Sequence, residues 1–372
     1  MTMTQLPSFA SAASQDEADA DAYQDAILPH VSRTFALTIP QLPADLRRAV
    51  ANAYLLCRAA DTIEDEPAFS AEEKRLYENE FLDAVIGRVD PQGFADRIAP
   101  MLSAKTLETE RDLMAHLALV LRVTASLGTA QRAAIEKCLR IMSHGMYDFQ
   151  RVAGTQGLAT LRDMERYCYC VAGVVGEMLT ELFLDHVSSL KPRRDELMRL
   201  ALSFGQALQM TNILKDQWED RANGVCWLPQ DVFGKYGVRL AELEAGRRDS
   251  NYERAMSELI GIAHAHLRRA LDYTLLFPTA EGGIRRFLLW SIGLAVLTLR
   301  SLHARLDFSA GAQVKISHRA VAGTVLLTRL ATRSNATLRH MFDLAARGLP
   351  LTPLDAEWDL AATPPGGRAR AG

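Results

Sequence analysis

The sequence has little of what marks disulfide-bonded, nucleic-acid-binding or membrane-spanning proteins. Its five cysteines are an odd number without paired spacing, which argues against a disulfide framework and for a reducing compartment. A net charge of −3 over 372 residues creates no field that would attract nucleic acid. The longest apolar run, residues 287–299, would span about 20 Å as a helix, less than the hydrocarbon core of a bilayer. We therefore expect a cytoplasmic protein without a transmembrane anchor or a nucleic-acid partner, in which this run is a buried core helix.

Proline and strand-forming patterns are scarce over most of the chain. No proline lies within residues 101–191 or 279–349, and both stretches are rich in helix-favouring residues. No Asn-Gly or Asp-Gly turn joins two alternating apolar runs, and no G-x-G-x-x-G follows a strand. The sequence therefore predicts one all-α domain of about ten or more helices, without a Rossmann module. We place this domain at residues 23–349, after a disordered acidic leader (1–22) and before a polar, flexible tail (350–372).

Two short groups of cysteines and histidines do not form a metal site in our interpretation. Cys168 and Cys170 lack the two-residue gap of zinc and redox motifs. His264 and His266 are two residues apart, so their rings would face different ways on a helix. We expect these histidines on the surface, without a function.

A first acidic cluster closes a predicted helix over residues 45–67. Its apolar residues recur at helical spacing, and a separate polar face carries Tyr54, Arg58, Asp61, Glu64 and Asp65. Carboxylates at i and i+4 repel each other, so the cluster lowers stability unless a cation neutralises it. Oxygen ligands suit Mg²⁺, which would also bind phosphate oxygens of a substrate. Taken alone, the pattern fits a solvated acidic helix end equally well.

A second helical pattern, over residues 206–220, repeats this arrangement. Its polar face carries two amides and an i, i+4 carboxylate pair, with a glutamate before the second carboxylate: Gln209, Asn212, Asp216, Glu219 and Asp220. The basic residues Lys215 and Arg221 flank the pair. Two such faces in one helical protein predict the opposing walls of a cavity that binds Mg²⁺ and a diphosphate.

Diphosphate chemistry explains why both walls would be needed. When an allylic diphosphate ionises, it leaves a carbocation and a highly charged leaving group. Mg²⁺ held by the carboxylates would stabilise the charge that develops on the leaving group, and arginine or lysine would add direct contacts. The carbocation needs an apolar pocket that excludes water, and a helical bundle supplies one.

Six motifs in combination resemble the squalene/phytoene synthase family, and within it the squalene synthases. The resemblance runs from about His30 to about Leu349. It is carried by VSRTF (31–35), YLLCRAADTIED (54–65), MSHGMYDF (142–149), YCYCVAGVVG (167–176), LQMTNILKDQWED (208–220) and VKIS (314–317). The resemblance implies an all-α isoprenoid-synthase helical bundle with a central cavity between the two aspartate motifs. It also implies a Mg²⁺-dependent prenyltransferase that couples two molecules of farnesyl diphosphate head to head.

The resemblance assigns roles to the residues that match the family's motifs. The implied metal ligands are Asp61, Glu64 and Asp65 in the first motif and Asp216, Glu219 and Asp220 in the second. The implied substrate region contains Ser32, Arg33, Phe35, Tyr54, Arg58, Gln209, Asn212 and Lys215, the last standing where eukaryotic members have arginine. Tyr167 matches the tyrosine that steers proton loss and stabilises cations, although the residues alone favour a core tyrosine. The four aspartates and Tyr167 are thus the expected catalytic residues.

One further segment bears on the product and the cofactor. Squalene synthases reduce the cyclopropylcarbinyl intermediate with NADPH, and Lys315 in VKIS stands where they place a lysine for the NADPH phosphate. Ser317 departs from the eukaryotic pattern, which has arginine there. The resemblance therefore implies squalene synthesis with NADPH. The alternative is NADPH-independent synthesis of dehydrosqualene, hydroxysqualene or phytoene within the same family.

Two other classes of protein stay open. A terpene cyclase would share the acidic motifs but would not carry YCYCVAGVVG or VKIS. A non-catalytic assembly factor derived from the family could lose the carboxylates, which are intact here. We expect a monomeric enzyme with a small-molecule substrate, which contacts a membrane peripherally when it releases an apolar product.

Overall fold

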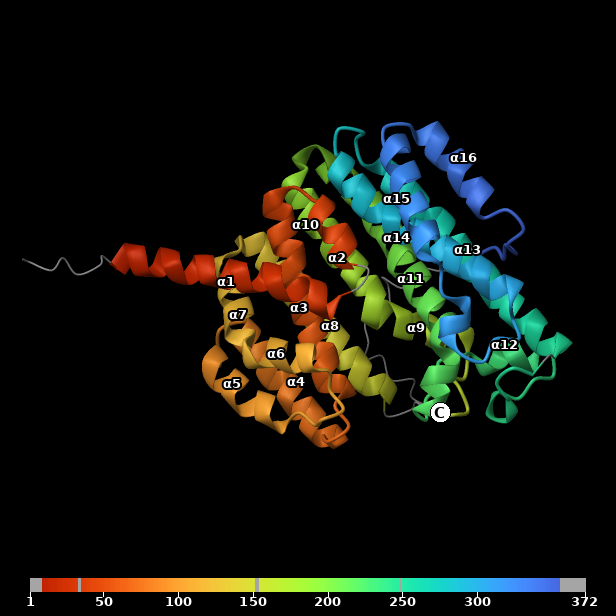
Figure 1. Ribbon diagram of the computed structural model, residues 1–372, viewed down its shortest axis with the longest axis horizontal. Helices are drawn as coiled ribbons and strands as arrows, with labels where there is room; N and C mark the ends of the chain where they lie inside the picture. The colour runs from red at the N-terminus through yellow and green to blue at the C-terminus, as the bar shows by residue number, and fades with distance from the viewer. Residues whose placement is uncertain (1–8, 33–34, 151–153, 248, 355–372) are drawn as a thin grey trace, which may run out of the picture. The chain divides into compact units, whose positions relative to one another are not determined.

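The structure, a computed structural model, describes residues 9–32, 35–150, 154–247 and 249–354 (Figure 1). These residues form sixteen α-helices, several short 3₁₀ turns and one π-helical turn. Within these ranges, β pairing is limited to an isolated bridge between Leu158 and Pro229. All five cysteines are buried, free thiols. The all-α prediction is confirmed.

The chain divides into two compact units. The first contains residues up to Ser143 and residues 181–186, and the second contains residues 144–180 and those from Val187 onward. The single catalytic domain that we predicted over residues 23–349, and its central cavity, stay predictions.

Helices from the N-terminal part of the chain build the first unit. They are α1 (Phe9–Val31), α2 (Phe35–Thr38), α3 (Ala44–Asp65), α4 (Ala71–Val85), α5 (Pro91–Ile98), α6 (Glu108–Ala115), α7 (Leu117–Ser126) and the first part of α8 (Thr129–Gln150), with the 3₁₀ turns η1 (Ile39–Gln41) and η2 (Ala99–Met101). Helix α3 is the centre of this unit, because α1, α4, α6 and α7 all pack against it.

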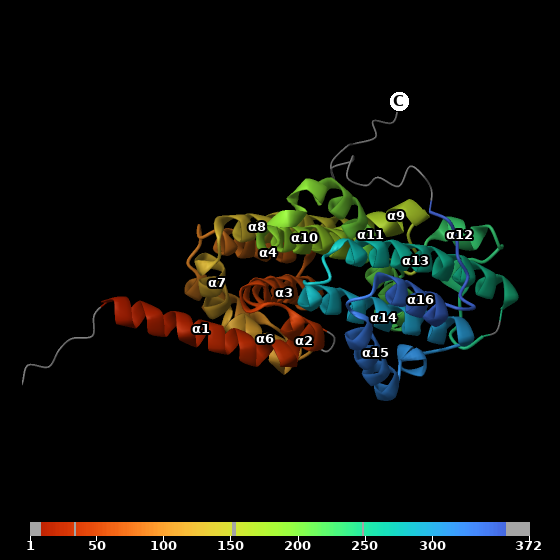
Figure 2. The same cartoon turned by 90° about the horizontal axis from the view of Figure 1, so that it is seen from above.

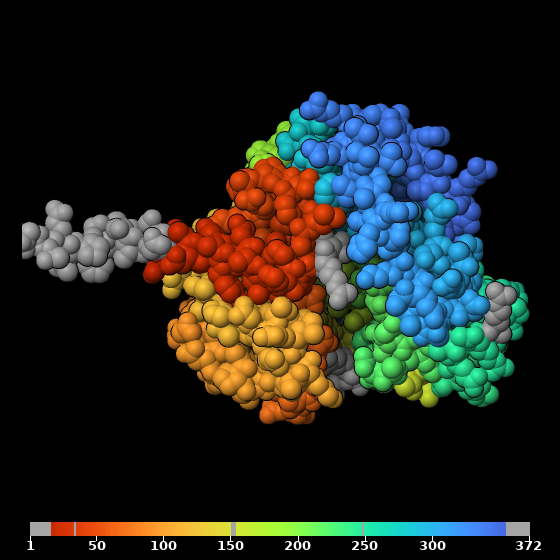
Figure 3. All heavy atoms as spheres, in the orientation of Figure 1, coloured from red at the N-terminus to blue at the C-terminus, as the bar shows by residue number. Residues whose placement is uncertain are grey.

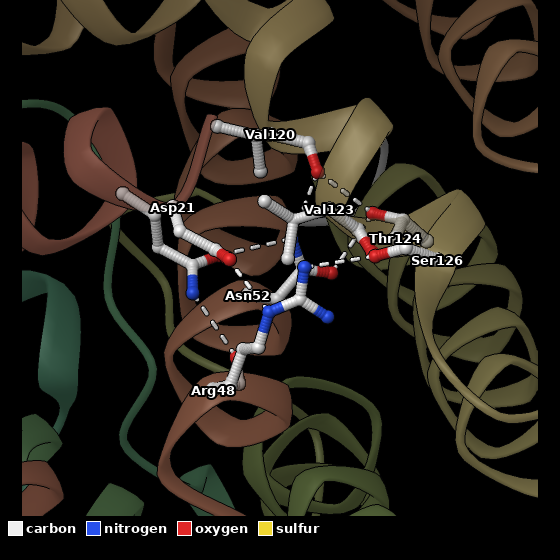
Figure 4. A network of polar contacts seen from close by, with 8 residues as sticks. Asp21, Arg48, Asn52, Val120, Val123, Thr124 and Ser126 are labelled. Atoms are coloured by element: carbon white, nitrogen blue, oxygen red, sulfur yellow. Dashed lines mark hydrogen bonds and ion pairs between the residues drawn. The ribbon is translucent and has the colours of Figure 1, made fainter. Parts of the chain in front are cut away.

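A buried polar network joins α1, α3 and α7 (Figure 4). Asn52 of α3 donates hydrogen bonds from Nδ2 to Oε1 of Gln24 at 3.1 Å and to the carbonyl oxygen of Val120 at 2.8 Å. The hydroxyl of Thr124 donates to Oδ1 of Asn52 at 2.8 Å. Asn52 is fully buried, so these bonds satisfy a side chain that would otherwise destabilise the fold. They fix the register of the three helices and so position α3.

Helix α1 includes most of the leader that we predicted as disordered, so the structure corrects that expectation for residues 9–22. Arg48 of α3 holds this helix, because its Nε donates to Oδ1 of Asp21 at 2.7 Å. Asp21 and Arg48 are distant in sequence, and the composition of the leader gives no sign of this contact. Residues 1–8 and 355–372 lie outside the described residues.

The later helices build the second unit. They are the last part of α8, α9 (Leu161–Cys168), the π-helical turn η3 (Tyr169–Gly173), α10 (Val174–His186) up to Thr180, α11 (Arg194–Ala222), α12 (Gln230–Gly234), α13 (Ser250–Leu276), α14 (Gly282–Ala304), α15 (His318–Ala331) and α16 (Asn335–Ala345), with the 3₁₀ turns η4 (Ser188–Arg193), η5 (Leu240–Glu242) and η6 (Gly311–Val314). Helices α11 and α13 pack along each other, α14 packs on both, and α15 lies on the outer side of α14 (Figure 2).

Two glycines let the segment YCYCVAGVVG pack closely on α11. A Cβ on Gly205 would lie 2.2 Å from the carbonyl oxygen of Ala172, and a Cβ on Gly176 would lie 2.5 Å from the carbonyl oxygen of Ala201. Both positions therefore require glycine. The turn η3 lies in the same segment, and π-helical turns inside α-helices frequently occur at functional sites.

Helix α14 contains the apolar run at residues 287–299 and extends beyond it at both ends, to 23 residues. It is one of two helical stretches, Leu161–His186 and Gly282–Ala304, that are long and apolar enough to cross a membrane. Within their apolar windows, 67% and 56% of the residues are buried, as in a core helix. The prediction of a buried helix is confirmed, and the helix is longer than its apolar run.

The prediction that His264 and His266 lie on the surface is wrong. Both are buried in α13, which other segments cover on more than one side. Nδ1 of His266 lies 3.3 Å from Oγ of Ser203, and Nδ1 of His264 lies 2.8 Å from the carbonyl oxygen of Pro350. Burial lowers the pKa of His266 to about 3, and the charge of Arg269 adds to this shift, so this ring is neutral.

Candidate active site

The first acidic motif lies at the C-terminal end of α3. The helix ends at Asp65, two residues before Pro67, because the residue that precedes a proline disfavours helical backbone angles. Its apolar stripe is buried as predicted. Burial of that stripe leaves the other face of the helix to Tyr54, Arg58, Asp61 and Asp65.

Arg58 is the centre of this polar face. One terminal nitrogen, Nη1, lies 3.5 Å from Oδ2 of Asp61 and 3.8 Å from Oε1 of Glu110 on α6. The other, Nη2, lies 3.5 Å from the hydroxyl of Tyr54. Nε of Arg58 is buried and has no hydrogen-bond partner among the residues that the structure describes. A buried donor without a partner destabilises a fold, and an anionic ligand would satisfy it.

The predicted residues of the N-terminal segment adjoin this face. Oγ of Ser32 accepts a hydrogen bond from the backbone N–H of Phe35 at 2.9 Å and so caps the start of α2. The ring of Phe35 lies 5.3 Å from that of Tyr54. A chain of contacts therefore runs from Ser32 to Asp61. Arg33, which we predicted beside them, lies outside the described residues.

The carboxylates of α3 are crowded. Burial raises the pKa of Asp61 to about 7; the charge of Arg58 opposes this shift, and those of Asp65 and Glu110 add to it. Burial also raises the pKa of Asp65, against the opposing charges of Arg58 and Lys74. When both groups are ionised they repel each other, so a bound divalent cation would favour their charged forms.

The second acidic motif lies near the C-terminal end of α11. The helix buries its opposite face, which leaves the predicted residues half-buried or exposed: Gln209, Asn212, Lys215, Asp216, Glu219 and Asp220. Nζ of Lys215 lies 3.0 Å from Oδ2 of Asp216. Oε1 of Glu219 accepts a hydrogen bond from the backbone N–H of Gly311 at 2.8 Å. The polar face of α11 is therefore the predicted one, with Gly311 as an additional neighbour.

Tyr167 belongs to an aromatic cluster in the second unit. Its ring stacks on that of Trp227, with ring centres 3.9 Å apart and planes 7° apart, and meets the edge of Phe149 at 5.5 Å. Faces of aromatic rings attract cations, and Trp gives the strongest such interaction. The cluster supplies π surface from two helices and a loop, and the catalytic role of Tyr167 stays a prediction.

Lys315 follows η6 and is exposed. The side chain before it, Val314, is fully buried and fixes the backbone at this point. Ser317 accepts a hydrogen bond from the N–H of Ala320 at 3.2 Å and caps α15. Lys315 and the exposed Arg319 therefore stand at the N-terminal end of a helix, where a phosphate is favoured.

The metal ligands that we predicted in the two acidic motifs stay predictions. Among the described residues, no group of three or more His, Cys, Asp or Glu side chains is placed to hold a metal ion. Mg²⁺ is usually bound through one or two carboxylates, with substrate phosphates and waters completing its shell. Each motif supplies such a pair at i and i+4, Asp61 with Asp65 and Asp216 with Asp220. Glu64 and Glu219, the third residue that we predicted in each motif, stay predicted ligands in the same way.

Three neighbours of the site left no signal in the sequence. Glu110 and Gly311 come from segments distant from the motifs that they contact, and Trp227 lies in the loop after α11, where no helical periodicity applies. The flanking Arg221 bonds the following loop, because its Nη1 donates to the carbonyl oxygen of Leu240 at 2.8 Å.

The squalene/phytoene synthase family matches residues 28–320 of the chain. This range is more than half of the sequence and includes both acidic motifs, Tyr167 and Lys315. The chain therefore belongs to the squalene/phytoene synthase family.

Individual relatives agree with this assignment. The squalene synthase of Eremothecium gossypii is 30% identical over 249 residues, which are 66% of this chain and 54% of that protein. The solved complex of TcSQS with the ligand BPH1237 has a TM-score of 0.68 and 25% identity, over 88% of this chain and 98% of that one. A dehydrosqualene synthase in complex with a ligand has a TM-score of 0.63 and 21% identity, over 87% and 99%, and shows the shared fold. The chain spans about half the length of the curated relatives that it matches.

We predict that Asp61→Asn stabilises the chain at pH 8 when no divalent cation is present. The pKa of Asp61 is about 7 in the folded chain, and about 4 is usual in an unfolded one. Between these values the folded state binds more protons, so stability falls as the pH rises through this window. Asparagine does not titrate, so the variant should exceed wild type by about 1–3 kcal/mol in free energy of unfolding. Urea denaturation at pH 5 and pH 8 measures the difference, which should be smaller at pH 5.

Asp45→Asn is the matched control. The pKa of Asp45 lies below its usual value. Burial alone would raise this pKa, but hydrogen bonds from the backbone of Leu46 and the side chain of His186 lower it. This variant should therefore gain no stability at pH 8. If Asp61→Asn is no more stable than wild type at pH 8, then the pKa of Asp61 is not raised by burial and by the neighbouring carboxylates.

Proposed function

We propose that the chain is a squalene synthase, which joins two molecules of farnesyl diphosphate head to head and reduces the intermediate to squalene. The observation that carries this proposal is the polar face of α3. There, Arg58 has a buried Nε–H with no partner among the described residues, beside the crowded carboxylates of Asp61 and Asp65. A diphosphate with its cations would satisfy both the donor and the carboxylates. The carboxylate pair on α11 and the family membership support the same conclusion.

The residues of the two motifs have distinct roles in this proposal. Mg²⁺, when bound by the aspartate pair of either motif, would neutralise a diphosphate and stabilise its departure. Arg58 would donate from Nε to a diphosphate oxygen, while Tyr54 and Glu110 orient its guanidinium. In the first step a carbon–carbon bond forms between the two substrates, one diphosphate leaves and one proton is lost. The product is a cyclopropylcarbinyl diphosphate, whose own ionisation then releases the second diphosphate.

The aromatic cluster would act on the carbocations. The rings of Tyr167 and Trp227 stack on each other, which leaves the outer face of each ring for a cation. Such a face would stabilise a nearby cation without reacting as water would. Tyr167 as a whole is buried, with 9% of its surface exposed. This arrangement supports a role for Tyr167 in guiding the loss of the proton.

NADPH would supply the hydride that captures the last cation and gives squalene. Lys315 and Arg319, at the N-terminal end of α15, are the residues that would hold a phosphate of the cofactor. The second candidate is synthesis of dehydrosqualene, hydroxysqualene or phytoene without NADPH. The specific observation in its favour is Ser317, which caps α15 in place of the arginine of eukaryotic members.

We predict that both carboxylate pairs are needed for turnover. Asp61→Asn or Asp216→Asn should lower the rate of diphosphate release from farnesyl diphosphate and Mg²⁺ by at least about a hundredfold, because each removes a group that stabilises charge in the transition state. The control is Asp45→Asn, which makes the same substitution in the first turn of α3. This variant should keep its activity. Near-normal turnover in either motif variant, with folding verified by circular dichroism, would overturn the metal assignment.

We predict that NADPH decides the fate of the intermediate. With NADPH the product should be squalene, and without it the enzyme should stop at the cyclopropyl intermediate or release dehydrosqualene and hydroxylated products. Lys315→Ala removes a charge-assisted contact, so it should raise the NADPH concentration needed for half-maximal squalene formation by about ten- to a hundredfold. Gas chromatography of the products across an NADPH titration measures both effects. One product profile at every NADPH concentration would favour the second candidate.

We further propose that the enzyme is cytoplasmic and monomeric and that it contacts a membrane through α15. In Figure 3 this helix lies in blue on the face toward the viewer. Leu326, Leu327 and Leu330 are 58%, 56% and 76% exposed. Residues 315–350 contain six lysines and arginines and only one acidic residue, Asp343. Exposed leucines among basic residues are what an anionic lipid surface binds.

Vesicle sedimentation tests this contact. Replacement of both Leu326 and Leu330 by asparagine should lower binding to phosphatidylglycerol vesicles by at least about threefold. Leu107→Asn is the matched control, because Leu107 is 63% exposed and belongs to the first unit. Equal binding of wild type to phosphatidylcholine vesicles, or equal losses in both variants, would contradict the proposal.

A further inference from the structure

Glu219 of the second acidic motif is already engaged within the protein. Its Oε1 accepts a hydrogen bond from the backbone N–H of Gly311 at 2.8 Å. The same turn of α11 crowds Gly311 from two more sides. A Cβ on Gly311 would lie 3.1 Å from the carbonyl oxygen of Lys215, 3.2 Å from Oδ1 of Asp216 and 3.3 Å from Oε1 of Glu219. The backbone at Gly311 therefore rests directly on the acidic motif, at a distance that suits glycine.

Residues 308–314, here called the anchor segment, are held at both ends. Phe308 and Val314 are fully buried, and the ring of Phe308 lies 6.5 Å from that of Trp218 on α11. Between these ends, the hydrogen bond from Gly311 to Glu219 is the polar attachment to α11. Lys315 follows the anchor segment directly, so the buried Val314 and this attachment together hold the backbone that carries Lys315.

We propose that Glu219 is a positioning residue rather than a metal ligand: it holds the anchor segment on α11 and thereby places Lys315 for the cofactor phosphate. A carboxylate that accepts a backbone N–H makes a charge-assisted hydrogen bond, which fixes a loop well. Asp216 and Asp220 remain as the i, i+4 pair for the metal. The role of Lys315 in this inference rests on the proposed function, whereas the attachment of the anchor segment does not.

Substitution by glutamine separates the two roles of Glu219. Glutamine keeps an oxygen that accepts the N–H of Gly311, but it has no charge for a metal. In Glu219→Ala, hydrogen exchange across residues 308–317 should be at least about tenfold faster than in wild type. The NADPH concentration for half-maximal squalene formation should rise by about tenfold. Glu219→Gln should restore wild-type values of both, and Gly311→Ala should reproduce the effects of Glu219→Ala. Glu244→Ala, which removes an exposed glutamate of the same unit, is the control and should change neither.

The possible outcomes are distinct. If Glu219→Gln is as damaging as Asp216→Asn to Mg²⁺-dependent diphosphate release, with wild-type hydrogen exchange, Glu219 is a metal ligand and the inference is overturned. Unchanged exchange in Glu219→Ala also overturns it. If NADPH has no effect on the products of any variant, the proposed function fails at the reduction step. Hydrogen exchange still decides whether Glu219 holds the anchor segment, because that readout needs no cofactor.

Discussion

The repulsion between carboxylates placed one helical turn apart is the constraint on which the site depends. On α3, Asp61 and Asp65 stand at i and i+4. Glu110 adds to the negative charge around Asp61, while Arg58 opposes the charge of both aspartates and Lys74 that of Asp65. Burial raises the pKa of Asp61 into the neutral range, so the protein alone does not hold this motif in its fully charged form. The motif reaches that form only when a cation arrives, which is what a site for a metal–diphosphate complex requires.

Arg58 shows how the fold tolerates this arrangement. The polar network around Asn52 fixes α3 between α1 and α7, and the buried stripe of α3 leaves the helix no freedom to rotate its acidic face away. Arg58 then reduces the repulsion without cancelling it, and its unsatisfied Nε–H remains for a ligand. Stability lost in the free protein is thus regained on binding, as is common at sites built for charged ligands. In the second motif a lysine reduces the repulsion between the carboxylates, since Lys215 lies beside Asp216.

The sequence predicted what periodicity and chain-local spacing determine. The proline-free stretches predicted helices, and Pro67 predicted where α3 ends. The two acidic faces were predicted from residues spaced three and four apart. Contacts between distant segments were not predictable. Nothing in the leader indicates that Asp21 pairs with Arg48, and His264 and His266 are buried because partners cover α13 on several sides. In the same way, Glu219 resembles a metal ligand in the sequence, and only the position of Gly311 reveals its hydrogen bond.

The most direct test of this account is the proton balance of ligand binding. Isothermal titration with farnesyl thiodiphosphate, an analogue that resists ionisation, is carried out with and without Mg²⁺ in buffers of different ionisation enthalpy. The account predicts binding that requires Mg²⁺ and releases about half a proton at pH 7, and more at pH 6, as Asp61 becomes fully charged. The diphosphate itself also loses protons when it binds Mg²⁺, so Asp61→Asn should release about half a proton less than wild type at pH 7 rather than none. Binding without Mg²⁺, or with no proton released at either pH, would contradict it.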